Sequence, residues 1–163
     1  ADSAADAVRA AQSLVAGIEY ATDADSTGAT EYIRHPAETL VEGVGDCDDK
    51  AVLLSALLSR PAYGYRTGLV MPRNHCATLL ARADLPAASL ADDPLTVALA
   101  GTTFVYVEAV QRVTPGDWAR DFGERPRLAA YRDGWYVLDP RAVVDSATRA
   151  IDRGEAGVVT RFV

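Results

Sequence analysis

The pattern of apolar and polar positions predicts three helices in the first part of the chain. Apolar side chains recur at helical spacing over residues 3–21. Pro36 suits a first helical turn and opens a short second helix that ends by Gly43. The third helix runs from Cys47 to about Arg60, and its apolar surface extends almost all the way round. Such a surface is typical of a helix buried in the middle of a domain.

Beyond these helices the pattern changes to the alternation expected of strands. The predicted strands cover residues 65–71, 75–82, 102–110 and 131–138. The Pro- and Ala-rich stretch 84–100 is expected to be a loop with one helical turn, and 143–151 a helix. Helices followed by a run of strands predict an α+β fold, in which the helix from Cys47 packs on a mainly antiparallel sheet. The length predicts a single domain over residues 1–163.

Composition and charge narrow the class of protein. Hydrophobic residues make up 49% and charged residues 24% of the chain, which is ordinary for a soluble globular domain. A net charge of −7 without any basic cluster argues against nucleic acid as a partner. No apolar run is long enough to span a bilayer, so no membrane contact is expected of this segment. We expect a soluble domain, either cytoplasmic or part of a larger membrane-anchored or exported protein.

The sequence GDCDDK places a cysteine at the start of the buried helix. Asp46 is a good N-cap, and Asp49 three residues later completes a capping box. The sulfur of Cys47 would then lie beside the unpaired N–H groups of the first turn, which are expected to lower the thiol pKa and to bind an oxyanion. The alternative is a small buried hydrophobe, for which a helix start between two carboxylates is a poor place. Cys47 is therefore predicted to be a nucleophile.

A cysteine nucleophile needs a base, which is usually histidine. His75 begins a predicted strand, and a strand end can aim its side chain at a helix terminus. His35 precedes Pro36 and fits a structural role better. Cys76 should face away from the His75 side chain and be buried, although a disulfide with Cys47 stays open. His75 is the predicted base.

A third residue should hold the imidazole in the correct tautomer. In TTFVYVEAV, Glu108 shares one strand face with Phe104 and Tyr106, and a carboxylate among such neighbours is hard to explain by packing. Asp139 in DGWYVLDP is the rival, although an Asp-Pro pair after a strand is often a turn. Glu108 is the predicted orienting residue.

Other polar and aromatic side chains have structural explanations. The carboxylates of GDCDDK resemble a cation site, yet helix capping accounts for at least two of them. Cys47, His75 and Cys76 lack the spacing of zinc ligands, so neither a metal nor a cofactor is expected. Core packing is the default for the aromatic candidates for an acyl pocket, which are Tyr106, Trp118 and Trp135.

The run RHPAETLVEGVGDCDDKAVLLSALL, followed by NHCATLL and FVYVEAV, resembles the transglutaminase-like superfamily of cysteine enzymes. The match is closest to the bacterial and archaeal branch and covers residues 32 to about 118. The resemblance implies a papain-like α+β core with a triad of Cys47, His75 and Glu108. Many relatives carry W-x-x-x-D-P-T where this chain has WYVLDPR, which keeps Asp139 as a rival third member.

These patterns predict a cysteine-dependent acyl transfer at a peptide or carboxamide carbonyl, with a protein or peptide as substrate. The acyl group would pass to water, as in a peptidase or amidase, or to an amine, as in a transglutaminase. Hydrolysis is favoured because water is always abundant unless a site excludes it. The alternative is a catalytically silent module of the same fold that binds a peptide or a partner domain. A metal-binding or redox domain is a third and weaker hypothesis.

Overall fold

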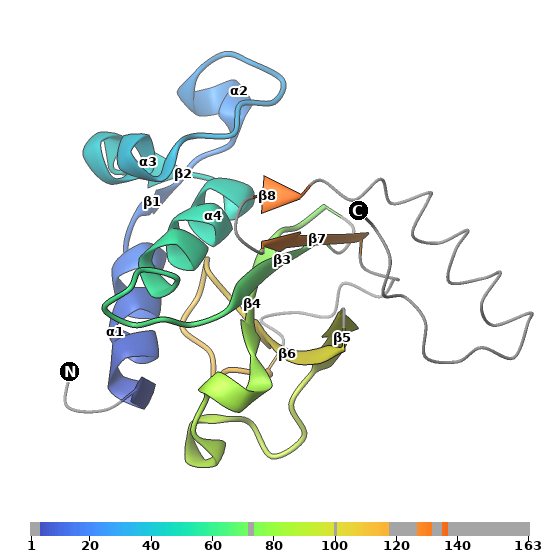
Figure 1. The fold of residues 1–163 in the computed structure, drawn as a ribbon. Helices are drawn as coiled ribbons and strands as arrows, with labels where there is room; N and C mark the ends of the chain where they lie inside the picture. The colour runs from blue at the N-terminus through green and yellow to red at the C-terminus, as the bar shows by residue number, and fades with distance from the viewer. Residues whose placement is uncertain (1–3, 72–73, 100, 118–126, 132–134, 137–163) are drawn as a thin grey trace, which may run out of the picture.

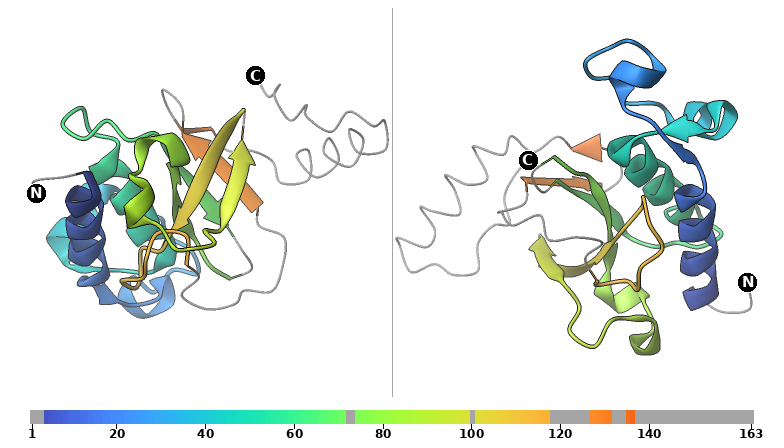
Figure 2. Two further views of the ribbon diagram at one scale, coloured as in Figure 1. Left: turned by 90° about the horizontal axis from the view of Figure 1, so that it is seen from below. Right: turned by 180° about the vertical axis from the view of Figure 1, so that it is seen from behind.

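The computed structural model describes residues 4–71, 74–99, 101–117, 127–131 and 135–136. The described part is an α+β fold in which helices from the N-terminal third cover one side of a curled antiparallel sheet (Figures 1 and 2). Within these ranges, every helix falls short of the length and apolarity that crossing a membrane requires. The predicted fold class is therefore confirmed at the level of helices packed on an antiparallel sheet.

Three of the helices follow the predicted pattern, with one correction at the first. The structure has α1 at Ala4–Ala16, α3 at Pro36–Glu42 and α4 at Cys47–Leu58, together with the single turn α2 at Asp23–Ser26. The prediction that the first helix reaches residue 21 is wrong. Gly17 donates its N–H to two carbonyls of the last turn of α1, and Glu19–Tyr20 then form β1. β1 pairs in parallel with β2 at Val44–Gly45.

The main sheet has six strands in the order β5-β6-β4-β3-β7-β8, and all its pairings are antiparallel. Its members are β3 (Thr67–Met71), β4 (Ala77–Ala81), β5 (Thr96–Leu99), β6 (Thr102–Val107), β7 (Arg127–Tyr131) and β8 (Trp135–Tyr136). The mainly antiparallel sheet predicted from the strand pattern is thus confirmed.

Two stretches differ from their predicted structure. The expected loop 84–100 contains one short 3-10 turn, at Ala87–Ser89, as predicted, but also the unexpected strand β5, and another 3-10 turn at Arg82–Asp84 leads into it. TVAL is a weak strand signal by itself, and it becomes a strand because β6 pairs with it. Within the expected strand 131–138, Tyr131 ends β7 and Trp135–Tyr136 form β8, which pairs antiparallel with β7, while 132–134 and 137–138 lie outside the described residues. The expected helix 143–151 lies outside the described residues.

Helix α4 is the centre of the core. It packs on β3 and β4, and both α1 and α3 pack against it. No residue of α4 is exposed, as the nearly all-round apolar surface predicted. A core cluster joins the helix to one face of the sheet and includes Leu53, Leu54, Leu58, Leu69, Leu80, Val105 and Val107. A second cluster on the other face includes Val70, Leu79, Phe104 and Tyr106.

The entry into α4 is tightly packed. Asp46 and Asp49 form the capping box that the sequence predicts. Gly45 lies so close to this turn that a Cβ there would be 2.8 Å from the Cβ of Asp49 and 3.2 Å from the Cγ2 of Thr39. Thr39 itself is fully buried in α3. The glycine of GDC therefore lets α3, β2 and the start of α4 approach one another.

We expect Gly45→Ala to lower the free energy of unfolding by about 1–3 kcal/mol, because the added methyl forces Asp49 or the backbone to move. Gly17→Ala is the matched control, since its Cβ would meet only two carbonyl oxygens at 3.3 and 3.4 Å. Urea unfolding of both variants measures the difference. An equal loss in both variants would contradict this view of Gly45.

Candidate functional site

The structure brings two of the three predicted site residues into direct contact. The carboxylate of Glu108 lies 3.0 Å from Nε2 of His75 through Oε2 and 3.2 Å through Oε1. Asn74 has a positive φ of 54°, a conformation that asparagine tolerates, and it turns the chain immediately before His75. Glu108 follows the last residue of β6. The ends of two adjacent antiparallel strands, β4 and β6, thus supply the pair.

Glu108 is fully buried and is held by further donors. The hydroxyl of Tyr106 donates to Oε2 at 2.5 Å, and the main-chain N–H groups of Ala109 and Val110 donate to Oε1 at 2.9 and 3.1 Å. Burial alone would raise the pKa of Glu108, but the hydrogen bonds from His75 and Tyr106 outweigh it and leave the pKa below its usual value. The carboxyl is therefore ionised at neutral pH and accepts a hydrogen bond from His75.

The main chain of Glu108 is fixed from the opposite side by α1. The side-chain amide of Gln12 donates to the carbonyl of Glu108 at 3.0 Å and to that of Val113 at 3.1 Å. Gln12 is buried on the same stripe of α1 as Val8 and Val15. A polar residue on an apolar stripe was the available sequence signal for this role, and the sequence analysis missed it.

Cys47 is the first residue of α4 and is half-buried. Its side chain packs against a core cluster that includes Cys76, and the main-chain N–H of Cys76 faces the sulfur closely enough to favour a thiolate. Cys76 directly follows His75, so the cysteine and the histidine occupy neighbouring parts of the structure. Both cysteines are free thiols, and Cys76 is buried as predicted.

The thiol pKa differs from the expected direction. Burial first and the Asp46 carboxylate second raise the pKa of Cys47 to about 11, because the N–H of Cys76 opposes these effects only in part. The prediction that the helix start lowers the thiol pKa is therefore wrong for this arrangement. The first physical reason is that burial disfavours the charged thiolate, and the second is that the two neighbouring carboxylates counteract the positive end of the helix. At neutral pH the thiol keeps its proton unless a base removes it.

The acidic residues around Cys47 serve mainly as caps. Asp46 accepts from the N–H of Asp48, and Asp48 accepts from the N–H of Asp49. Burial and the neighbouring Asp48 raise the pKa of Asp46 to about 7. Possible ligand atoms of Asp46, Cys47 and Asp48 lie within 4.8 Å of one another, the spacing of a cation site. Since helix capping already accounts for both carboxylates, this spacing alone does not assign a metal.

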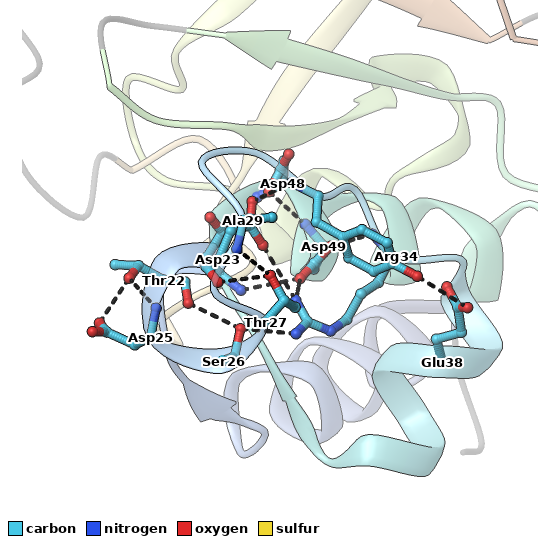
Figure 3. Close-up of polar contacts among 12 residues, drawn as sticks. Thr22, Asp23, Asp25, Ser26, Thr27, Ala29, Arg34, Glu38, Asp48 and Asp49 are labelled. Atoms are coloured by element: carbon cyan, nitrogen blue, oxygen red, sulfur yellow. Dashed lines mark hydrogen bonds and ion pairs between the residues drawn. The ribbon is translucent and has the colours of Figure 1, made fainter.

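A buried arginine holds the segment before α3 against the start of α4 (Figure 3). Arg34 is 1% exposed, and its Nη1 lies 2.7 Å from Oδ2 of Asp49 and 3.4 Å from Oδ1 of Asp23. Its Nε contacts Glu42 at 2.9 Å, and its main-chain N–H donates to Asp49 at 2.7 Å. The same Asp49 carboxylate accepts from the N–H of Asp46. Arg34 therefore stabilises the turn that presents Cys47, a role for which the sequence carried no local signal.

The remaining predicted residues are placed as follows. His35 is exposed and caps α3 by accepting the N–H of Ala37 at 3.3 Å, which fits the structural role expected of it. Tyr106 is fully buried and bonded to Glu108, so it contacts the pair rather than lining an open acyl pocket. Asp139 and Trp118 lie outside the described residues, as does the side chain of Trp135.

We expect Arg34→Met to lower the free energy of unfolding by about 3 kcal/mol or more, because it leaves Asp49 and Asp23 as buried charges without their partner. The control is Arg66→Met, which breaks an exposed pair with Asp84 and should cost less than about 1 kcal/mol. Urea unfolding measures both. Similar losses in the two variants would show that the Arg34 network adds no special stability.

We expect Asp46→Asn to lower the pKa of Cys47, because asparagine retains the helix cap and removes the carboxylate charge. Unit charges about 5 Å apart interact by roughly 1 kcal/mol in water, so the shift should be about half a pKa unit or more. The ultraviolet absorbance of the thiolate, titrated in a Cys76→Ser background, measures it. Asp25→Asn, at an exposed acid, should leave the titration unchanged. An unchanged pKa of Cys47 in Asp46→Asn would contradict the inferred effect of the Asp46 charge.

Comparisons with protein-family models, with curated proteins and with solved structures found no match. The candidate site therefore rests on its own geometry. That geometry is a buried carboxylate–imidazole pair at the ends of two strands, with a helix-terminal thiol beside the residue that follows the histidine.

Proposed function

We propose that this chain is a cysteine-dependent acyl-transfer enzyme of the transglutaminase-like type, with a papain-like core. Cys47 would be the nucleophile, His75 the base and Glu108 the residue that orients His75. The observation that carries the proposal is the ionised and fully buried Glu108 carboxylate, held 3.0 Å from Nε2 of His75. A buried carboxylate is costly, and its contact with Nε2 holds the imidazole of His75, whose neighbour Cys76 has its main-chain N–H beside the sulfur of Cys47.

The contact with Glu108 determines which ring nitrogen can act. Because an ionised carboxylate only accepts hydrogen bonds, Nε2 of His75 carries the proton. Nδ1 of the neutral ring is then the proton acceptor. With the pKa of Cys47 raised to about 11, the thiol is protonated at neutral pH. The proton therefore moves to Nδ1 as the sulfur attacks, and Glu108 stabilises the imidazolium that forms.

The remaining steps follow from the same groups. Attack of the sulfur on the carbonyl carbon forms an S–C bond and an oxyanion, for which the main-chain N–H groups of Cys47 and Cys76 beside the sulfur are the available donors. The imidazolium of His75 then gives its proton to the departing amine as the C–N bond breaks, which leaves a thioester on Cys47. Water or an amine attacks that thioester and gives its proton to His75; the S–C bond then breaks, the product leaves, and the proton returns from His75 to the sulfur of Cys47. Hydrolysis is the proposed outcome, because water is the more abundant acceptor.

One observation favours a second function, a silent module of the same type that binds a peptide or a partner domain. The raised pKa of Cys47 makes its resting thiol unreactive. The two functions differ in whether an acyl group can be transferred to Cys47 with the help of His75.

The test is intact-mass analysis after exposure to p-nitrophenyl acetate and to a glutamine-containing peptide. An enzyme should gain one acyl group, mapped to Cys47, and lose it with time. Cys47→Ala should gain none, Cys76→Ala should behave as the parent does, and His75→Ala should react about 10²–10⁴-fold more slowly. Added methylamine distinguishes the outcomes, because transamidation gives an N-methylamide product. Absence of acylation at Cys47, or an equal rate in His75→Ala, would support the silent module.

A further inference from the structure

A cavity of about 640 Å³ lies between α1 and the segment that follows Glu108. In Figure 1 this segment is the loop that returns from β6 toward α1. The walls come from α1, from the 3-10 turn at Ala87–Ser89 and from that loop. They include Arg9, Gln12, Ser89, Arg112 and Pro115. Cys47, His75 and the side chain of Glu108 do not line this cavity, so it is distinct from the proposed catalytic site.

The charge of the cavity is opposite to that of the chain. Arg9 and Arg112 are its charged residues, and no acid is among the described residues that line it, although the chain carries a net charge of −7. Arg34 and Arg66 both pair with carboxylates, whereas neither Arg9 nor Arg112 has a carboxylate partner in the described part of the chain. Two guanidinium groups at one cavity, neither of them paired with a carboxylate among the described residues, can bind oxyanions through paired N–H donors.

The other walls match a ligand with a carbon skeleton. Val8, Ala88, Val113 and Pro115 add apolar surface, and Ser13 and Thr114 add hydroxyl groups. The volume lies in the range of sites that hold small organic molecules. A small ligand with an acidic group at each end would place one group at each arginine and its carbon chain along the apolar walls.

The two sides of the cavity are held together by a buried hydrogen-bonding residue. Gln12 is 2% exposed, and its amide bridges the carbonyls of Glu108 and Val113. Arg9 lies one helical turn before Gln12, and Arg112 directly precedes Val113. The bridge therefore fixes the backbone that bears one arginine relative to the backbone that bears the other, which lowers the entropic cost of binding a ligand between them.

We propose that this cavity binds a small dicarboxylate, with Arg9 and Arg112 each taking one carboxylate. The site does not depend on the proposed acyl transfer, because no catalytic side chain contributes to it. It adds an anion-binding function to a chain whose overall charge disfavours anions.

The test is a titration of the full ¹⁵N-labelled chain, followed by amide chemical shifts, with glutarate, with butyrate as the monocarboxylate and with inorganic phosphate. Glutarate should give saturable shifts centred on residues 8–13, 88–89 and 112–115. In the double variant Arg9→Gln/Arg112→Gln the affinity should fall about tenfold or more, as expected when charge-assisted bonds are lost. Arg60→Gln, at an exposed arginine outside the cavity, should retain the parent affinity.

Several results would overturn the proposed site or its ligand. No saturable shift with glutarate, or unchanged affinity in a double variant that unfolds at the parent temperature, would overturn the site. Tighter binding of phosphate or butyrate than of glutarate would overturn the dicarboxylate assignment. Cys47→Ala should bind glutarate as the parent does, so failure of the acyl-transfer proposal and failure of this one are distinguishable.

Discussion

The buried carboxylate of Glu108 is the constraint around which the described structure is organised. An ionised carboxylate without water is stable only when donors surround it, and here they come from four residues. These donors require the end of β6, the turn after it and the segment that leads into β4 to meet at one point. Gln12 then joins the same turn to α1 through the main chain. The position of His75 is thus a consequence of satisfying Glu108.

A second buried charge network lies at the start of α4, beside Cys47. Arg34 and Asp49 fix the turn into α4, and the carboxylates of that turn surround Cys47 with negative charge. The same turn that positions the sulfur therefore makes its thiolate harder to form. In the proposed reaction the helix terminus would position Cys47 as the nucleophile, and the imidazole that Glu108 holds would activate it. The carboxylate of Asp49 thus stabilises the turn that bears Cys47, whereas the carboxylate of Glu108 would affect the reaction through His75.

Local features of the sequence were sufficient to predict α4, its capping box and the antiparallel arrangement of the strands. Asp46, Asp49 and the apolar run after Cys47 act within a few residues of one another, so their effect is visible in the sequence. The pairing of His75 with Glu108 was also predictable, because His75 begins a predicted strand and the glutamate interrupts the apolar face of another.

Long-range contacts explain what the sequence analysis missed. β5 exists because β6 pairs with it, and the first helix stops at Ala16 because the chain turns to pair with β2. Arg34 pairs with Asp23 and Asp49 only after the chain has folded. The side chain of Gln12 donates a hydrogen bond to the carbonyl of Glu108, which lies 96 positions away in the sequence. The raised pKa of Cys47 has the same origin, since burial contributes more to it than any neighbouring charge.

The measurement that tests the central claim most directly is the rate of Cys47 alkylation by iodoacetamide at about pH 7, compared between the parent chain and His75→Ala and read by peptide mass mapping. Cys76 in the same molecules is the internal control. If Glu108-held His75 takes the thiol proton, the parent should react roughly tenfold or more faster than the variant at Cys47, while Cys76 stays slow in both. Equal rates at Cys47 in the two proteins would contradict the account.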